Sequence, residues 1–126
     1  MKKFNRTERE QAFFIMEQWV EKLQKESNKN DTICRDFKQA TLVGFDYLSN
    51  AYLILACEHL REMSRDIRIL TSLCHKAKGE RLNSAPAKDQ NKTLNRFFSL
   101  KREYQLKWVA WYDERESLLL FLQRVF

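Results

Sequence analysis

Glycine and proline are scarce in this chain, whose 126 residues contain two glycines and one proline. Because these residues mark turns and strand ends, their scarcity excludes a fold of many short elements and favours one domain of a few long helices. No apolar run approaches the roughly 20 residues that span a bilayer. The opening MKKFNRTERE also lacks the apolar core of a secretory signal. We therefore expect a cytoplasmic protein with no membrane partner.

Cysteine is sparse as well, and its spacing fits no known framework. Cys34, Cys57 and Cys74 form an odd set without a C-x-x-C pair, so neither disulfides nor a zinc motif is predicted. Convergence of Cys57 and Cys74 with His59 and His75 on a metal is an alternative. Small apolar cysteines on helices usually fill core instead, so we expect no metal and no cofactor.

Recognisable catalytic motifs are also missing. No strand leads into a Gly-rich loop, no serine sits in an elbow motif, and neither histidine has the context of a nucleophile and base pair. Asp113, Glu114 and Glu116 are the best acidic cluster, but consecutive helical residues diverge by about 100° around the axis. The sequence thus predicts a protein that is not an enzyme and has no small-molecule substrate.

Positive charge is abundant and unevenly distributed. The net charge is +6, yet residues 61–107 alone carry twelve Lys and Arg against five Asp and Glu, while the rest carries eleven against twelve. Such an excess indicates an acidic partner, either nucleic acid or an acidic peptide. Solvated helix faces are the alternative explanation.

Apolar periodicity predicts an all-α, single-domain bundle of about four helices over residues 7–26, 32–44, 49–77 and 91–125. Thr7 and Glu10 fit a capping box at the first helix. The polar stretch SNKND at 27–31 predicts a break, after which Asp31 or Thr32 would cap the second helix. The stretch 78–92, with the chain's only proline, predicts the loop that makes the last two helices an antiparallel pair.

The last helix contains the most informative stretch, KREYQLKWVAWYDER at 101–115. Its aromatic residues belong to a stripe spaced alternately by three and four, which predicts that they mostly face a core. Lys101 and Arg115 share this stripe, although a core does not require them. On the preceding helix, Arg61, Arg65 and Arg68 share one outward face. Such a row is either solvated or binds a ligand.

Three stretches in order resemble the PriC family, primosomal replication protein N-double-prime: LACEHLREMSRDIRILTSL (55–73), NSAPAK (83–88) and REYQLKWVAWYDERESLL (102–119). The first has the family's A-E-H-L start with Cys57 inserted, and the second its S-A-P-x-K loop. In the third, Glu103 and Tyr104 stand at the acid-aromatic pair of the family's box, and Lys107 at an arginine of that box. Glu114 and Arg115 stand at a later E-R pair.

The resemblance covers about residues 50–120. The first 45 residues show no convincing match, and longer family members continue into a further basic helix. The resemblance implies an adaptor for DNA replication restart, a primosome component without a catalytic centre. Such a protein binds single-stranded DNA and the acidic, Phe-ended tail of single-strand DNA-binding protein (SSB), and helps to load the replicative helicase.

The resemblance also carries over a site for the SSB tail. Lys107 would be the cation that contacts the tail and Arg115 its neighbour. On the same stripe, Lys101 would extend the row, and the apolar wall would be formed by Tyr104, Trp108 and Trp111, for which a core position is the alternative. Single-stranded DNA would be bound through its phosphates. The cations expected to hold them are Arg61, Arg65, Arg68, Lys76, Lys78, Arg81 and Arg96.

Two other classes of function stay open. Phe4, Phe13, Phe14 and Trp19 are more aromatic surface than a small bundle needs, which fits a helical protein-binding module, chaperone or antitoxin-like, without a nucleic-acid role. A metalloenzyme that uses the cysteines and histidines is the third reading.

Overall fold

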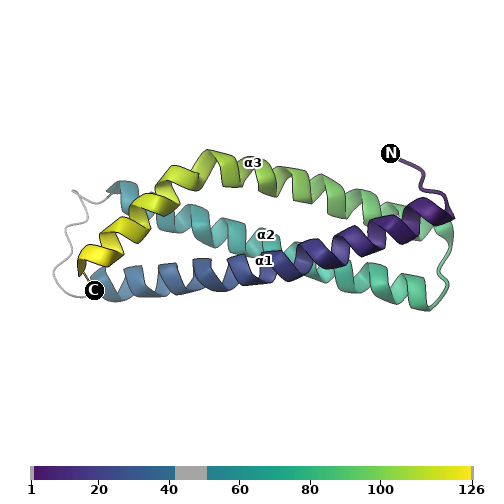
Figure 1. Ribbon diagram of the computed structural model, residues 1–126, viewed down its shortest axis with the longest axis horizontal. Helices are drawn as coiled ribbons and strands as arrows, with labels where there is room; N and C mark the ends of the chain where they lie inside the picture. The colour runs from purple at the N-terminus through teal and green to yellow at the C-terminus, as the bar shows by residue number, and fades with distance from the viewer. Residues whose placement is uncertain (1, 42–50, 126) are drawn as a thin grey trace.

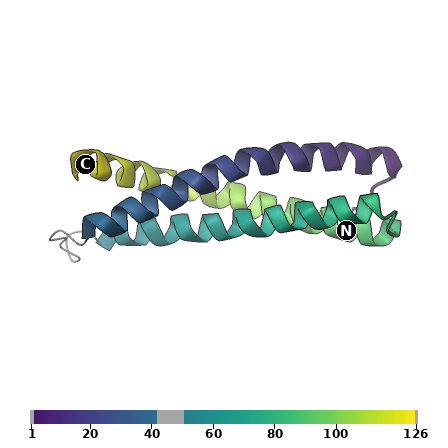
Figure 2. The ribbon, with the colours of Figure 1, turned by 90° about the horizontal axis from the view of Figure 1, so that it is seen from below.

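A computed structural model describes residues 2–41 and 51–125, with the side chain of Thr41 excepted. Three long helices make up almost all of them: α1 (Arg6–Thr41), α2 (Ala51–Leu82) and α3 (Ala87–Val125). The helices form an elongated bundle in which α2 runs antiparallel to both neighbours (Figures 1 and 2). The prediction of an all-α fold is confirmed, and no strand occurs among the described residues.

No helix in the described ranges has the combination of length and apolar character that a bilayer span demands.

The number of helices differs from the prediction, because the polar stretch 27–31 does not break the chain. α1 continues through it, so the predicted helices 7–26 and 32–44 are one element where the structure describes them. The reason is register: Ser27 and Asn30 continue the inward stripe of Val20 and Leu23, and both are buried. No Gly or Pro interrupts the helix there. The predicted boundaries at 42–50 lie outside the described residues.

The N-terminus of α1 has a capping box, two residues before the predicted one. The Asn5 side-chain oxygen accepts a hydrogen bond from the Glu8 backbone N–H at 2.8 Å, and Glu8 Oε1 accepts one from the Asn5 N–H at 3.1 Å. This reciprocal pair satisfies two donors that the first helical turn leaves without partners. Asn5 therefore takes the role that the sequence assigned to Thr7.

The turn between α2 and α3 is much shorter than the predicted loop 78–92. α2 runs past Gly79 to Leu82, and only residues 83–86 connect the helices. Ser84 adopts a φ of 51°, its N–H bonds to the Arg81 carbonyl, and the Ala85 N–H bonds to the Glu80 carbonyl. These are the two bonds of a Schellman C-cap. The tight turn makes α2 and α3 an antiparallel pair, as predicted.

The hydrophobic core runs the full length of the bundle. Its fully buried side chains come from all three helices and include Met16, Leu60, Ile67, Leu70, Leu94, Phe97 and Leu118. On α2 the inward stripe starts at Ala56 and Cys57, whereas Tyr52 and Leu55 are half exposed.

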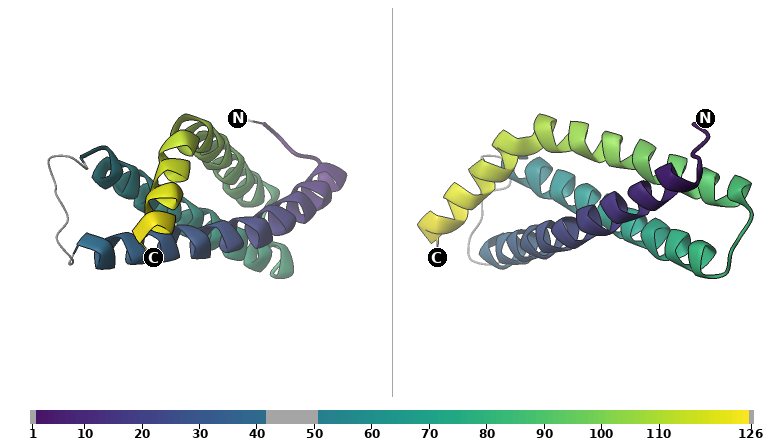
Figure 3. Two further views of the ribbon diagram at one scale, coloured as in Figure 1. Left: turned by 60° about the vertical axis from the view of Figure 1, so that its left-hand side comes forward. Right: turned by 45° about the vertical axis from the view of Figure 1, so that its right-hand side comes forward.

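The C-terminal half of α3 turns toward the end of α1. α3 bends near its middle and then passes across α1 (Figure 3). Phe37 and Phe121 form an edge-to-face pair there, with ring centroids 6.0 Å apart. The N-terminal halves of α1 and α3 are joined differently, because Lys2 bridges to Asn95 through two hydrogen bonds. Between these two attachments the α1–α3 side of the bundle carries surface pockets.

The left-handed conformation of Ser84 yields a stability prediction. Because L-residues other than glycine disfavour this region, Ser84→Gly is expected to raise the free energy of unfolding by about 0.5–1 kcal/mol. Urea unfolding followed by circular dichroism measures it. Ser84→Ala is the control and should give no gain. Equal gains for both variants would contradict the assigned turn geometry.

Candidate functional site

The arginine row of α2 lies over a pocket between α2 and α1. Arg61, Arg65 and Arg68 line this pocket of about 330 Å³, which we call the arginine pocket, together with Asp31, Cys34 and Ser64. Arg68 pairs with Asp31 at 3.6 Å and Arg61 with Glu58 at 3.4 Å, both at exposed positions. Such surface pairs are weak and open readily. Arg65 makes no ion pair within the described ranges.

The floor of the arginine pocket includes a buried hydroxyl. The Ser64 side chain is 1% exposed, and its Oγ has no hydrogen-bond partner among the described residues. An unpaired buried hydroxyl costs free energy until it finds a partner. The pocket thus gathers three cations and one acid above a buried hydroxyl, and this positive balance suits an anion such as a phosphate.

The other predicted DNA-binding cations do not join this pocket. Lys76 and Lys78 are exposed further along α2, and Arg96 is exposed on α3. Arg81 lies twenty residues from Arg61, about 30 Å by helix rise. There its guanidinium stacks over the Phe13 ring at 5.3 Å. The seven cations are therefore spread along the molecule, with one compact group at residues 61–68.

Lys107, the predicted tail-binding cation, is engaged between α2 and α3. Its Nζ lies 2.8 Å from Glu62 Oε1 and 2.8 Å from Asp66 Oδ2. Burial alone would lower the pKa of Lys107, but the hydrogen bonds to the two carboxylates outweigh it and raise the pKa. The same contact with Lys107 lowers the pKa of Glu62.

Arg115 is likewise engaged, in this case with α1. Its side chain is only 13% exposed, and Nε donates to Asn30 Oδ1 at 3.3 Å. The guanidinium also pairs with Glu26 at 3.7 Å and with Glu116 at 3.6 Å. Lys107 and Arg115 hold the helices together, so a ligand carboxylate would have to displace an internal one to reach them.

His59 and Trp111 fill the space between these two ion-pair groups. Their rings stack with centroids 4.0 Å apart and nearly parallel planes. Glu114 pairs with His59 Nδ1 from the next turn of α3. Trp111, which was predicted to face the core, and Glu114 therefore both contact His59. This half-buried contact joins α2 to α3.

Lys101 has a different environment from the other two cations on its stripe. Its ammonium lies over the Trp19 ring at 4.0 Å and near the Phe98 ring at 5.7 Å. No carboxylate pairs with it among the described residues, and burial lowers its pKa. Of the three cations on this stripe, it is the one whose charge no acidic side chain neutralises within the described ranges.

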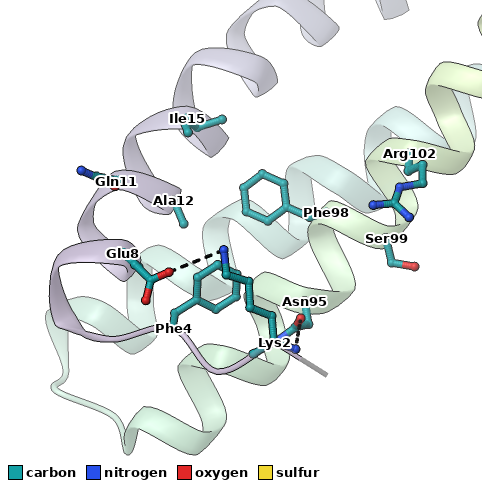
Figure 4. Close-up of a pocket in the computed structure, with 10 residues that line it drawn as sticks. All are labelled: Lys2, Phe4, Glu8, Gln11, Ala12, Ile15, Asn95, Phe98, Ser99 and Arg102. Carbon is teal, nitrogen blue, oxygen red and sulfur yellow. Dashed lines mark hydrogen bonds and ion pairs between the residues drawn. The ribbon is translucent and has the colours of Figure 1, made fainter.

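A groove between α1 and α3 extends to both sides of Lys101. On one side a pocket of about 500 Å³, the N-terminal pocket, has apolar walls of Phe4, Ile15 and Phe98, with Lys2 and Arg102 at its edge (Figure 4). Lys2 there pairs with Glu8 at 3.5 Å. On the other side a pocket of about 350 Å³, the tryptophan pocket, is lined by Trp19, Lys22, Leu23, Glu26, Tyr104, Gln105, Trp108 and Val109.

Tyr104 and Trp108 occupy different levels of the tryptophan pocket. Trp108 is half buried and tilts against Tyr112, with ring centroids 5.0 Å apart. Tyr104 is 3% exposed, and burial raises its pKa to about 12. Its hydroxyl has no hydrogen-bond partner in the described part of the chain. Both rings thus form an apolar wall of the pocket, and the Tyr104 hydroxyl is a donor without a partner among the described residues.

Sequence reasoning did not join the α1 and α3 halves of this groove. Phe4 and Trp19 were expected only as surplus aromatic surface, and Phe98 and Arg102 lie beside the stripe that was singled out on α3. The signal was present in the spacing. Residues 8, 11, 15, 19, 22 and 26 of α1 follow a three-and-four repeat, as do 95, 98, 102, 105 and 109 of α3.

No group of three or more His, Cys, Asp or Glu side chains in residues 2–41 and 51–125 is arranged to hold a metal ion. Comparison with protein-family models, with curated proteins and with solved structures finds no match to this chain. The PriC resemblance therefore stays a hypothesis that rests on the motifs.

The Lys107 ion pairs predict a defined dependence of stability on pH. Since the folded-state pKa of Glu62 is lowered, its contribution is present above the ordinary value of 4.5 and is lost as the pH falls through the folded pKa. Lys107→Met should therefore lower the free energy of unfolding more at pH 7 than at pH 3. Urea titrations at both pH values measure this.

Lys92→Met, at an exposed position of α3, is the matched control and should cost the same at both pH values. An equal loss at pH 7 and pH 3 for Lys107→Met would show that the ion pairs do not stabilise the bundle.

Proposed function

We propose that the protein is a non-catalytic adaptor for replication restart in the cytoplasm, which binds single-stranded DNA and the acidic tail of SSB and helps to reload the replicative helicase. The observation that carries the proposal is Lys101, a cation without a carboxylate partner among the described residues that lies between two apolar pockets of the α1–α3 groove. An acidic segment that ends in an aromatic residue has the complementary chemistry. The motif resemblance supplies the biological context.

The tail is assigned to the tryptophan pocket and Lys101. A terminal Phe ring would enter between Trp19 and Trp108, while Lys101 and Lys22 receive the terminal carboxylate and the acids before it. Lys107 and Arg115 take a supporting part, since their contacts to α2 and α1 fix the position of α3. A carboxylate that reaches Lys101 gains an ion pair without breaking one.

Titration with a peptide of several acids ending in Phe tests this site. Lys101→Ala should weaken binding about tenfold, the loss of one charge-assisted interaction of about 1.5 kcal/mol, and Trp108→Ala should weaken it by removing the apolar wall. Isothermal calorimetry gives the affinities. Lys88→Ala, at an exposed position in the first turn of α3, is the charge-matched control.

Changing the terminal Phe of the peptide to Ala should lower its affinity for the parent protein. The same change should lower the affinity for the Trp108→Ala variant much less, because that variant already lacks the wall that the Phe ring contacts. The opposite result is that Lys107→Ala or Arg115→Ala abolishes binding although the variant stays folded, and that Lys101→Ala still binds the peptide. In that case the tail binds at the ion-pair groups, and the assignment to Lys101 is wrong.

Single-stranded DNA is assigned to the arginine pocket on the α1–α2 side. Three guanidiniums within residues 61–68 line this one pocket, whereas the other predicted cations are scattered along the molecule. Binding through phosphates depends steeply on salt and little on base sequence. The exposed Lys76 and Lys78 would extend the contact along α2.

Salt-dependent binding of a labelled single-stranded oligonucleotide tests the DNA site. The double variant Arg61→Ala, Arg65→Ala should weaken binding and reduce the slope of log K against log salt concentration by about 0.7 for each phosphate that is no longer neutralised. Fluorescence anisotropy at several salt concentrations measures both. The matched control, Arg6→Ala with Arg35→Ala, removes the same charge from exposed positions of α1 and should retain the slope.

A helical protein-binding module without a nucleic-acid role is the second candidate. It is favoured by large apolar side chains that are mostly exposed on α1 and α3, with Phe14 at 62%, Leu106 at 66% and Val109 at 74% exposure. Such side chains are typical of a surface that a partner covers. Absence of oligonucleotide binding even at low salt, with the peptide still bound, would favour this candidate.

A further inference from the structure

Cys34 of α1 and Cys57 of α2 face each other across the helix interface. The Cys34 thiol donates a hydrogen bond to the Cys57 backbone carbonyl, with sulfur and oxygen 3.6 Å apart. Both side chains are buried, at 7% and 2% exposure. Cys74, the third cysteine, is seventeen residues further along α2 and has no such contact with either of them in the described ranges.

We propose that Cys34 and Cys57 are a redox pair that hydrogen peroxide converts into a reversible disulfide joining α1 to α2. The sequence alone favoured no disulfide, because stable disulfides are rare in reducing compartments. Those that do occur there are usually transient and redox-sensing. The proposal stands independently of the DNA and peptide sites.

The two thiols have different roles in the reaction. The hydrogen bond from Cys34 lowers the pKa of Cys57 to about 7, an effect that the nearby charge of Arg61 reinforces against the opposing effect of burial. The pKa of Cys34 is raised by its hydrogen bond with Cys57 and by burial. Because the thiolate is the nucleophile, Cys57 attacks first, and Cys34 keeps its proton for the second step.

The reaction balances without any further reagent. The Cys57 thiolate attacks one oxygen of the peroxide, so that a sulfur–oxygen bond forms, the O–O bond breaks, and hydroxide leaves and takes up a proton as water. The Cys34 sulfur then attacks the resulting sulfenic acid. The S–S bond forms, the S–O bond breaks, and the hydroxyl leaves with the Cys34 proton as a second water. Excess thiol such as glutathione reverses the bond by exchange.

Access to the pair is through the arginine pocket. Cys34 lines that pocket beside Arg61 and Ser64, whereas Cys57 does not line it but is in contact with Cys34, so peroxide reaches the Cys57 sulfur by passing Cys34. A peroxide molecule is small enough to enter there, whereas a bulky alkylating reagent is not. We therefore expect peroxide to oxidise Cys34 and Cys57 in the folded protein under conditions in which a bulky reagent does not alkylate them.

Peptide mapping of the oxidised full-length protein tests the pair directly. Trypsin cuts between the two cysteines at Arg35 and Lys38, so peptides 30–35 and 39–61 stay together only through the disulfide. After peroxide treatment and blocking of remaining thiols in denaturant, we expect this linked pair, with Cys74 alkylated. Dithiothreitol should restore three free thiols, and oxidation should raise the urea midpoint of unfolding, because the bond closes a loop across α1 and α2.

Two variants complete the experiment. Cys74→Ser is the matched control and should form the linked peptide as the parent does, whereas Cys34→Ser should give no linked peptide and leave the Cys57 thiol oxidised or free. Linkage through Cys74, linkage only between separate molecules, or equal oxidation of all three thiols would each overturn the proposal. The parent protein alone decides among these outcomes, even if a variant fails to fold.

Discussion

The contact between Arg115 and the middle of α1 is the constraint on which the arrangement of the helices depends. Its guanidinium is almost covered, and Asn30 and Glu26 provide the oxygens that a buried cation needs. If α1 ended at residues 27–31, as the composition there suggests, Arg115 would be buried without these partners, which costs several kcal/mol. The polar residues inside α1 and the cation inside α3 therefore require one another. They keep α1 continuous and hold the bent end of α3 against it.

The same contact explains why cations on one stripe of α3 have different uses. Lys107 and Arg115 already have carboxylates at ion-pair distance, so an acidic ligand could only exchange one carboxylate for another. Lys101 lies on aromatic rings, an interaction worth about 0.5–2 kcal/mol, and a carboxylate can approach it without displacing another acid. Cations that share one stripe of the helix thus differ in whether they already have a carboxylate partner. A ligand carboxylate gains most free energy at the cation that has none.

Periodicity predicted the helical content and the inward stripe of α3, because apolar spacing determines which face is buried. The antiparallel α2–α3 pair was predicted from the polar stretch that contains the proline. Composition failed where a polar residue has a partner distant in sequence. Ser27 and Asn30 resemble a loop until Arg115 is placed against Asn30. Gly79 suggested a break, whereas the helix continues to Leu82 and ends in a C-cap built on Ser84. The residues of each groove wall recur at three-and-four spacing, but the α1–α3 groove itself does not follow from that spacing, because its walls come from helices that are not consecutive and whose pairing no local pattern specifies.

The two candidate sites share α1 but use different sides of it. Asp31 and Cys34 face the arginine pocket, whereas Trp19, Lys22 and Glu26 face the tryptophan pocket. DNA and an acidic peptide bound in this way would not collide, and at physiological salt their repulsion across the bundle is screened over about 8 Å. Any coupling between them must then pass through the position of α1 itself. Arg115 holds α1 from the α3 side, and the Cys34–Cys57 contact meets it from the α2 side. A bond at that second contact would fix α1 to the wall of the arginine pocket, while the tryptophan pocket keeps the ion pairs that position α3.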